Sequence, residues 1–247
     1  MSASLEKIKN IIEKYHQVKQ IIIIGGGTSI KLFDLSQLQV TNHQLIICCN
    51  QAFHLIPTAH ISHHSDYAWW LQYQDQLQQD FQGELITGCG LGHNKAYPEM
   101  VSQLRCARVD SIADLFTQPD LIYGNNCGLQ ALALAHLFQP TSIYLLGFDF
   151  NANADRTHGY AKTDLKELAH YEKFWGLFLK DFRRFEVHRK SVWLKAHPDC
   201  ALPQIYNLNP QSALTLYPPP AELPAALEQV KINPAETGFI LEANDSD

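Results

Sequence analysis

A run of four isoleucines followed directly by three glycines constrains the fold of this chain more than any other feature. All side chains at positions 21–24 are apolar, and a strand of that kind is buried on both faces, as in a parallel sheet covered by helices. The glycines at 25–27 turn the chain, and Thr28 or Ser29 can cap a helix that follows. The pattern therefore predicts a strand, a tight turn and a helix.

Strands and helices alternate along the rest of the chain. Further strands are predicted at 44–50, 59–64, 83–89, 142–148, 191–196 and 204–209. Helices are predicted close to the N-terminus, after the segment HSDYAWW, at 128–138 and at 164–182. Such alternation is typical of an α/β protein with a doubly wound, mostly parallel sheet of the Rossmann-like type.

The sequence divides into three parts. Apolar residues at helical spacing predict an N-terminal helix within residues 1–19. The alternating strands and helices occupy residues 20–216, which we interpret as a single Rossmann-like domain. Residues 217–247 begin with YPPPAELP and then become acidic, so we interpret them as a Pro-rich acidic tail.

The charge and hydropathy of the chain restrict its partners. The chain has 19 Lys and Arg against 25 Asp and Glu, which gives a formal net charge of −6. This balance lacks the excess of basic residues that is typical of proteins that bind duplex nucleic acid. No apolar run approaches the roughly 20 residues that cross a bilayer, and the N-terminal segment lacks the apolar core of a signal peptide. We expect a cytoplasmic protein with no nucleic-acid partner and no transmembrane segment; a homo-oligomer is left open.

The cysteines do not form a metal or redox motif. No pair among the six has the two-residue gap of a zinc ribbon or a redox-active dithiol. Cys48 and Cys49 are adjacent on a predicted strand, so their side chains should point to opposite faces. We expect reduced and mostly buried thiols.

Polar residues and glycines mark the ends of the predicted strands. In such sheets, ligands bind beyond the carboxyl ends of the strands, near the point where the strand order reverses. The GGGTS turn offers backbone amides and a helix N-terminus for a phosphate. It is neither a dinucleotide motif, because Ile30 stands where the third glycine belongs, nor a P-loop, which needs GKS or GKT. A tight turn without a ligand is the alternative.

Three other stretches carry candidate binding residues with simpler structural alternatives. Asn50 and Gln51 end a strand and suit a base or sugar edge, or they cap the next turn. Asn126 begins the helix at 128–138, as a ligand contact or as a plain cap. Cys127 lies at the same helix N-terminus, where a thiol pKa is lowered, but no histidine partner is fixed by the sequence.

The histidines at 60, 63 and 64 do not predict a metal site. A strand would direct His63 and His64 to opposite faces, whereas metal ligands must converge. Asp66, next to Tyr67 and two tryptophans, shapes a pocket wall or begins a helix. We therefore predict no metal ligands.

His158 is the candidate catalytic residue. It follows Asp149, the end of a buried strand, in a polar loop that should lie on the ligand side of the sheet. Histidine titrates near neutral pH, so an imidazole placed there can act as a general base. An ordinary surface histidine is the alternative.

At this point the ordered motifs resemble a known family. IIIIGGGTSIK, CCNQAF, NNCGLQALALAHLFQPTSIYLLGFDF and HGYAKTDLKELAHYEKF are similar to segments of bacterial CMP-sialic acid-dependent sialyltransferases that decorate lipooligosaccharide. The chain also resembles the phage, bacterial and archaeal group classed with 6-hydroxymethylpterin pyrophosphokinase, in which HSDYAWW and IYNLNPQSAL fit as well. The resemblance covers roughly residues 20–216 and implies a nucleotide-binding catalytic domain.

The resemblance to sialyltransferases implies that His158 deprotonates an acceptor hydroxyl and that no cofactor or metal is required. The donor would be a CMP-sugar and the second partner a glycan acceptor. Together with the strand-end residues above, the candidate nucleotide and donor site comprises Gly25, Gly26, Gly27, Ser29, Asn50, Gln51, Asp66, Asn126, Cys127, Gly128, Asp149, Asn151 and Tyr160.

Three positions depart from the sialyltransferase pattern. Gly26 replaces an asparagine, Cys127 replaces a serine, and Asn151 replaces a tyrosine that assists the departing phosphate. Candidates for a second group that assists the phosphate are Tyr160, Arg156 and Lys162.

Three functions are therefore compared. The first is a nucleotide-sugar-dependent glycosyltransferase that acts on a surface glycan or glycolipid precursor. The second is a Mg²⁺-dependent hydroxymethylpterin pyrophosphokinase-like transferase, with Asp149, Asp66 or Asp155 as metal ligands. The third is a non-catalytic nucleotide-binding module.

Overall fold

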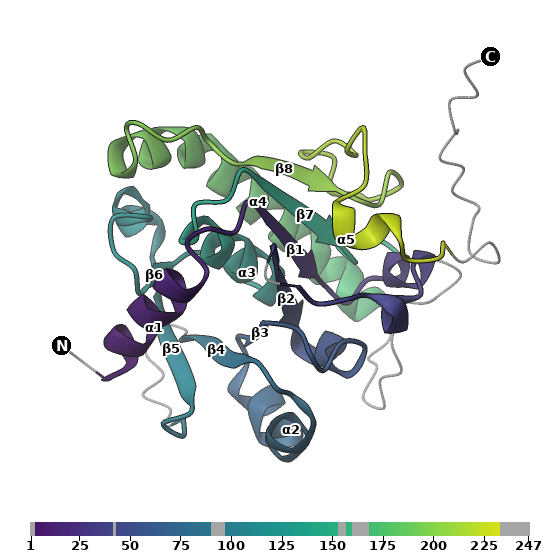
Figure 1. Ribbon diagram of the computed structural model, residues 1–247. Helices are drawn as coiled ribbons and strands as arrows, with labels where there is room; N and C mark the ends of the chain where they lie inside the picture. The colour runs from purple at the N-terminus through teal and green to yellow at the C-terminus, as the bar shows by residue number, and fades with distance from the viewer. Residues whose placement is uncertain (1–2, 42, 90–96, 153–156, 160–167, 233–247) are drawn as a thin grey trace.

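A parallel sheet of eight strands organises the computed structural model (Figure 1). The structure describes residues 3–41, 43–89, 97–152, 157–159 and 168–232. The strands are β1 (Gln20–Ile24), β2 (Gln44–Cys49), β3 (Ile61–His64), β4 (Glu84–Cys89), β5 (Val101–Cys106), β6 (Leu121–Ile122), β7 (Ser142–Leu146) and β8 (Gln204–Asn207). Their order is β6-β5-β4-β3-β2-β1-β7-β8, and each neighbouring pair is parallel.

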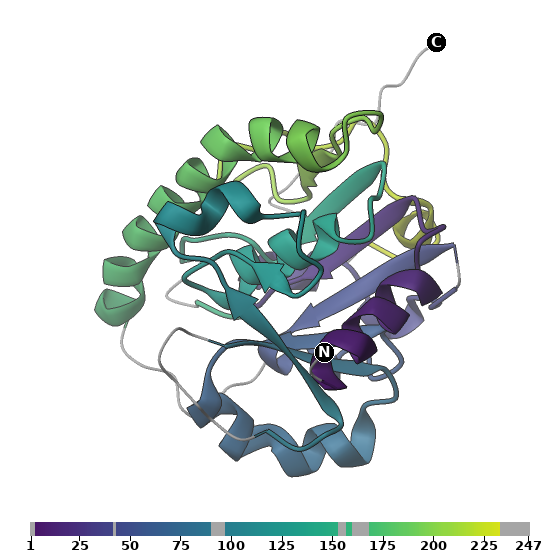
Figure 2. The ribbon, with the colours of Figure 1, turned by 90° about the vertical axis from the view of Figure 1, so that its left-hand side faces the viewer.

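Helices cover both faces of the sheet (Figure 2). The α-helices are α1 (Ala3–Lys14), α2 (Tyr67–Asp80), α3 (Cys127–His136), α4 (Leu168–Ala196) and α5 (Ala225–Glu228). Short 3-10 helices are η1 (Thr28–Leu32), η2 (Leu35–Gln37), η3 (Asn50–His54) and η4 (Val109–Asp114). Helices α1, α3 and α4 pack on one face, and α2, α5, η1, η2 and η3 on the other. The doubly wound α/β architecture predicted from the sequence is thereby confirmed.

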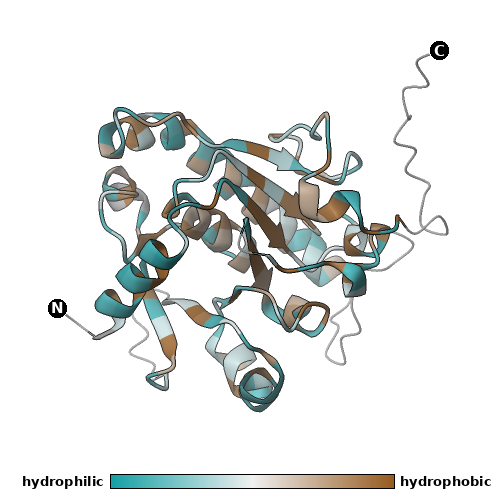
Figure 3. Cartoon of the chain, viewed as in Figure 1, coloured by the Kyte–Doolittle hydropathy of each residue, from teal (hydrophilic) through white to brown (hydrophobic). Residues whose placement is uncertain are grey.

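The isoleucines of β1 lie at the centre of the sheet. Each of the four is fully buried, and β1 pairs with β2 on one side and with β7 on the other. Alternate residues of β1 enter opposite cores: Ile21 and Ile23 contact the α1, α3 and α4 layer, whereas Ile22 and Ile24 contact the opposite layer. Figure 3 shows these central strands as the most hydrophobic part of the structure.

The cysteines behave as the strand pattern predicted. Cys48 joins the core on the α2 side and Cys49 the core on the α3 side. Among the cysteines whose side chains are described, all are free and only Cys200 is exposed.

Two parts of the predicted order of elements were wrong. The segment 191–196 is the last part of α4 and not a strand. Val192 and Trp193 face the core one to two turns after Phe185 and Arg189, which is helical spacing. Strands β5 and β6 were missed, because exposed Arg105 and half-buried Gln103 interrupt the apolar pattern of β5 and β6 is only two residues long.

The first part of the segment interpreted as a tail packs onto the sheet. Tyr217, Leu227 and Val230 are buried, and Ile232 forms an antiparallel bridge with Phe33. Within the described ranges, no helix combines the length and the apolar character needed to cross a bilayer.

Candidate functional site: a cleft where the strand order reverses

A cleft lies at the carboxyl ends of β1 and β7, where the order of the strands reverses. From β1 the chain adds strands outward to β6, and then β7 and β8 are added on the other side of β1. The loops after β1 and β7 therefore leave in opposite directions and open a crevice between them. Its enclosed volume is about 190 Å³, which is below the ~300–1,000 Å³ of most small-molecule sites, so a ligand of that size would project from the open mouth.

The glycine turn after β1 forms one wall of this cleft. The amide of Gly25 donates to Leu146 O at 2.7 Å, and that of Gly27 donates to Gly147 O at 2.8 Å. A Cβ on Gly25 would lie 2.5 Å from Gly147 O, so only glycine permits this approach of the two backbones. The Gly26 amide, between them, has no acceptor among the described residues.

The helix expected after the glycines is instead the five-residue 3-10 helix η1. Gly27 precedes it, with no side-chain cap, so the prediction that Thr28 or Ser29 caps a helix was wrong. Both hydroxyls donate to the carboxylate of Asp149. Of the three glycine amides, a phosphate at this turn would therefore meet only that of Gly26, beside a very short helix.

The N-terminus of α3 forms the opposite wall. Asn126 caps it by accepting a hydrogen bond from the Leu129 amide at 3.0 Å, as the capping alternative predicted. Asn126 O also accepts from the Gln130 amide. In a helix the first amides have no intrahelical acceptor, so those of Cys127 and Gly128 are the ones left at the cleft. Their orientation and the helix dipole favour an anion there.

Asp149 joins the glycine turn to the end of β7. Its carboxylate accepts from the Ser29 amide and hydroxyl, from the Thr28 hydroxyl and from Asn209 Nδ2. The residue is only 2% exposed although it borders the cleft. The carboxylate therefore holds the backbone of the site in place, and its direct contact with a nucleotide stays a prediction.

A polar segment after β8 supports the same loop. Asn207 Nδ2 and the Ser212 hydroxyl both donate to Phe148 O, and the Ala213 amide donates to Asp149 O. Sequence reasoning did not assign these residues to the site. The feature of the sequence that could have indicated them is the group of amide and hydroxyl side chains at the end of β8 and directly after it.

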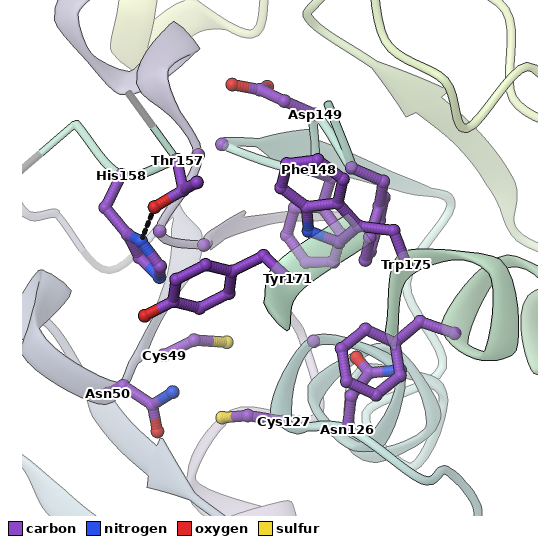
Figure 4. Close-up of a pocket in the computed structure, with 17 residues that line it drawn as sticks. Cys49, Asn50, Asn126, Cys127, Phe148, Asp149, Thr157, His158, Tyr171 and Trp175 are labelled. Carbon is purple, nitrogen blue, oxygen red and sulfur yellow. Dashed lines mark hydrogen bonds between the residues drawn. The ribbon is translucent and has the colours of Figure 1, made fainter. Parts of the chain in front are cut away.

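His158 reaches the cleft from the loop after β7. Its Nδ1 lies 2.8 Å from the Thr157 hydroxyl, and its ring meets the edge of Tyr171 at a centroid distance of 5.1 Å. The next residue, Gly159, donates its amide to Gly26 O at 3.0 Å. This bond attaches the histidine segment to the glycine turn, and Figure 4 shows the imidazole beside Tyr171.

Aromatic side chains of α4 complete the cleft and were not predicted as site residues. Tyr171, Trp175 and Phe178 line it together with Phe148 and Phe150. The α4 residues are spaced by four and three positions, so they share one helix face. That spacing was visible in the sequence but is also typical of an ordinary core face.

The surroundings of Cys127 disfavour its thiolate form. Burial, with a smaller contribution from the Cys49 thiol, raises the pKa of Cys127 well above its usual value. Its Sγ donates to His63 O at 3.3 Å. The lowered pKa expected at a helix N-terminus was therefore wrong, because loss of solvent outweighs the helix dipole.

Several predicted site residues lie outside the cleft. Ser29 is buried behind it, Gln51 donates to the Tyr73 hydroxyl at 2.9 Å, and Asp66 caps α2. Asn151 donates to Gln211 O at 2.8 Å. Tyr160 lies outside the described residues, as do Asp155, Arg156 and Lys162. The cleft brings together the rest of the predicted set: Gly25, Gly26, Gly27, Asn50, Asn126, Cys127, Gly128, Asp149 and His158.

The histidines at 60, 63 and 64 have structural positions. His63 and His64 are fully buried on adjacent strand positions, and burial lowers their pKa values to about 4 and about 3. The His64 ring stacks on Trp70 of α2, and His60 Nδ1 accepts from the Ile46 amide. In the part of the chain that is described, no three His, Cys, Asp or Glu residues gather as metal ligands.

Comparison with known proteins gives limited similarity. No protein-family model matches the chain, and a search of curated proteins finds no significant match. Among solved structures, the apo form of an α-2,3-sialyltransferase from Campylobacter jejuni is similar over 82% of this chain and 79% of that one, with 16% identity and a TM-score of 0.40. A similarity this low does not establish a function, which must be argued from the residues of the site.

Proposed function

We propose that this protein is a nucleotide-sugar-dependent glycosyltransferase that uses a CMP-activated sugar and a glycan acceptor without a metal. The observation that carries the proposal is the position of His158. It borders the same cleft as the Gly26 amide and the first amides of α3, at the point where the strand order reverses. The order of the sequence motifs adds independent support, because it resembles that of CMP-sialic acid-dependent sialyltransferases.

The phosphate of the donor would bind between the glycine turn and α3. The amides of Gly26, Cys127 and Gly128 supply donors, and the ten-residue helix α3 adds its dipole. These groups are fixed before the reaction, so they can stabilise the negative charge that grows on the phosphate as it departs. No described lysine or arginine lines this cleft.

The base and sugar of the donor would contact the remaining walls. Tyr171 and Trp175 offer ring faces for stacking, and Phe150 extends the same wall. Asn50, at the end of β2, has a left-handed backbone with φ of 50°, which asparagine tolerates better than most residues. Its amide can both donate to and accept from a base or ribose edge.

His158 would act as the general base. With Nδ1 engaged by Thr157, Nε2 is the nitrogen assigned to the acceptor hydroxyl. As that oxygen attacks the anomeric carbon, its proton passes to Nε2. The bond from the anomeric carbon to the phosphate oxygen breaks, and CMP leaves with the electron pair. Inversion at the anomeric carbon follows from attack opposite the leaving group.

A panel of activated sugars tests this function. The protein is incubated with CMP-, UDP- and GDP-sugars, in EDTA and in Mg²⁺, and release of nucleotide is measured together with thermal shifts for CMP, CDP, UDP, GDP and ATP. We expect CMP to raise the melting temperature by mass action and a CMP-sugar to be consumed equally in EDTA. Absence of binding and of donor hydrolysis across the panel would refute the proposal. Binding of ATP that depends on Mg²⁺ would favour the pyrophosphokinase instead.

A further inference from the structure

A second cavity lies behind the glycine turn, and none of the roles described above uses it. Its lining combines mostly buried apolar side chains, which we call its floor, with two lysines and a histidine that are more exposed, which we call its rim. The residues that define it are Ile30, Phe33, Leu55, Lys31, Lys231 and His54. Asp34 and Gly159 also border it.

Adjacent residues of one segment border the two cavities, and we call this segment the wall between them. His158 borders the first cavity and Gly159 the second, and successive α-carbons are about 3.8 Å apart. Gly159 is pinned in this wall by its bond to Gly26 O and by contact with Ile30, whose Cγ1 would lie 2.3 Å from a Cβ on Gly159. The second cavity is therefore bordered by the residue that follows the candidate base in the chain.

The rim of the second cavity is cationic in a chain that is acidic overall. Lys31 and Lys231 come from segments 200 positions apart, and the bond from the Asp34 amide to Lys231 O, at 3.0 Å, holds these segments together. The carboxylate of Asp34 accepts from Ser36 Oγ and Gln37 Nε2, and these bonds together with the nearby Lys231 charge lower its pKa, so Asp34 stays a neighbouring anion of Lys231. Two cations thus face one internally bonded anion, although the whole chain has a formal charge of −6.

His54 adds a neutral polar group to this rim. Burial lowers its pKa, so the imidazole is uncharged at neutral pH and can both donate and accept a hydrogen bond. The apolar rings and side chains of the floor, such as Phe33 and Leu55, suit the apolar face of a sugar ring.

We propose that the second cavity is the acceptor site and that Lys31 and Lys231 bind an anionic group, a carboxylate or a phosphate, on the acceptor glycan. This inference rests on the proposed function, because it takes His158 to be the base. Lysine pairs bind such anions through charge-assisted hydrogen bonds. The anchored glycan then extends across the wall formed by Gly159 and presents its hydroxyl to the imidazole.

Ligand-observed NMR titration tests the inference. The carboxylate probe is 3′-sialyllactose, with lactose as its neutral partner, and the phosphate probe is galactose 1-phosphate, with galactose as its neutral partner. The test variant is Lys31→Gln/Lys231→Gln, and Lys31→Arg/Lys231→Arg restores the charge. The matched control is Lys180→Gln/Lys190→Gln, which removes two exposed lysines of α4. Binding of CMP is measured for each protein, and melting temperatures confirm that each is folded.

We expect at least one anionic probe to bind and its neutral partner to bind much more weakly. The glutamine variant should lose roughly tenfold in affinity for the anionic probe, and this affinity should fall with added salt. The arginine variant and the α4 control should stay within about threefold of wild type. Which probe binds decides between carboxylate and phosphate.

Two results would overturn the inference: no anionic probe binds the wild-type protein, or the glutamine variant binds as well as the α4 control. The CMP measurement separates this failure from failure of the proposed function. If anionic probes bind through the lysines but CMP does not bind, the anion site stands and the glycosyltransferase proposal fails. If CMP binds and the lysines have no effect, only the acceptor site is refuted.

Discussion

The hydroxyl of Ser29 donates a hydrogen bond to the carboxylate of Asp149 across 120 positions of sequence. The Ser29 amide donates to the same carboxylate at 2.8 Å. These bonds join the loop after β1 to the loop after β7, which are the two sides of the cleft. One buried carboxylate therefore joins the two sides of the site.

Replacing Asp149 should destabilise the whole fold. Asp149→Ala leaves the Ser29 amide and Asn209 Nδ2 without their acceptor in a buried place, and a buried unpaired polar group costs ~1–3 kcal/mol. We expect the free energy of unfolding in urea to fall by about 2–4 kcal/mol. Asp199→Ala, at an exposed position, is the control and should change it by less than about 0.5 kcal/mol. Equal stability of both variants would show that Asp149 is not structural.

Gly27→Ala should damage the cleft specifically. A Cβ there would lie 2.5 Å from the Asp149 carboxylate, although the φ of −66° at Gly27 suits alanine. The cost is thus a steric clash and not backbone strain. We expect loss of CMP binding by calorimetry and a lower melting temperature. The matched control is Gly176→Ala, where a Cβ would meet nothing within 4 Å. That control should gain about 0.5–1 kcal/mol in helix stability and bind CMP normally.

Cys127 should be unreactive and dispensable for chemistry. Its raised pKa keeps it as the thiol, which is a poor nucleophile. In native protein at pH 8, iodoacetamide should label the exposed Cys200 first and Cys127 at least about tenfold more slowly, as read by peptide mass spectrometry. Cys127→Ser should retain donor hydrolysis. Rapid labelling of Cys127, or loss of hydrolysis in the serine variant, would argue for nucleophilic catalysis.

Stability should fall as the solution is acidified below neutral pH. Burial lowers the pKa of His136 to about 3, against ~6.5 in the unfolded chain. Between these values the unfolded state binds a proton that the folded state excludes. Each such histidine therefore weakens folding by up to about 1.4 kcal/mol per pH unit as the pH falls from about 6 to 4. Above pH 7 the histidine is neutral in both the folded and the unfolded state. The free energy of unfolding therefore no longer changes with pH through this group.

The variant His136→Gln tests this pH dependence. It removes one of the buried histidines, whose ring stacks on Phe116 and whose Nδ1 bonds Leu132 O. Urea unfolding between pH 7.5 and 4.5 should give a shallower slope for the variant, by about 1 kcal/mol per pH unit. The variant should also be less stable at pH 7.5, because it loses that packing. An unchanged slope would mean that His136 does not remain neutral in the folded state.

The sequence predicted most of the sheet because its strands are unusually apolar. Four buried isoleucines in β1 and an entirely buried β2 can only be central strands. The same reasoning failed for 191–196, because a short apolar run does not distinguish a strand from the end of a helix. It also missed β5, in which exposed Arg105 and half-buried Gln103 interrupt the apolar pattern.

The candidate site could be predicted only in part. The glycines and His158 were found because strand ends and polar loops are visible in a sequence. The structural role of Asp149, whose carboxylate accepts hydrogen bonds from Ser29 and Asn209, could not be predicted. Its partners come from segments that meet only after folding. The aromatic residues Tyr171 and Trp175 were missed because helical spacing alone does not show which face meets a cleft.

The most direct test of the proposed function is the rate of sugar transfer by His158→Gln. With the CMP-sugar that the donor panel identifies, we expect the rate to fall about 10²–10⁴-fold, the usual contribution of a general base, while the affinity for CMP stays within threefold of wild type. His43→Gln, at an exposed position outside the cleft, should transfer sugar at the wild-type rate. Transfer by His158→Gln at the wild-type rate would contradict the proposal that His158 is the base.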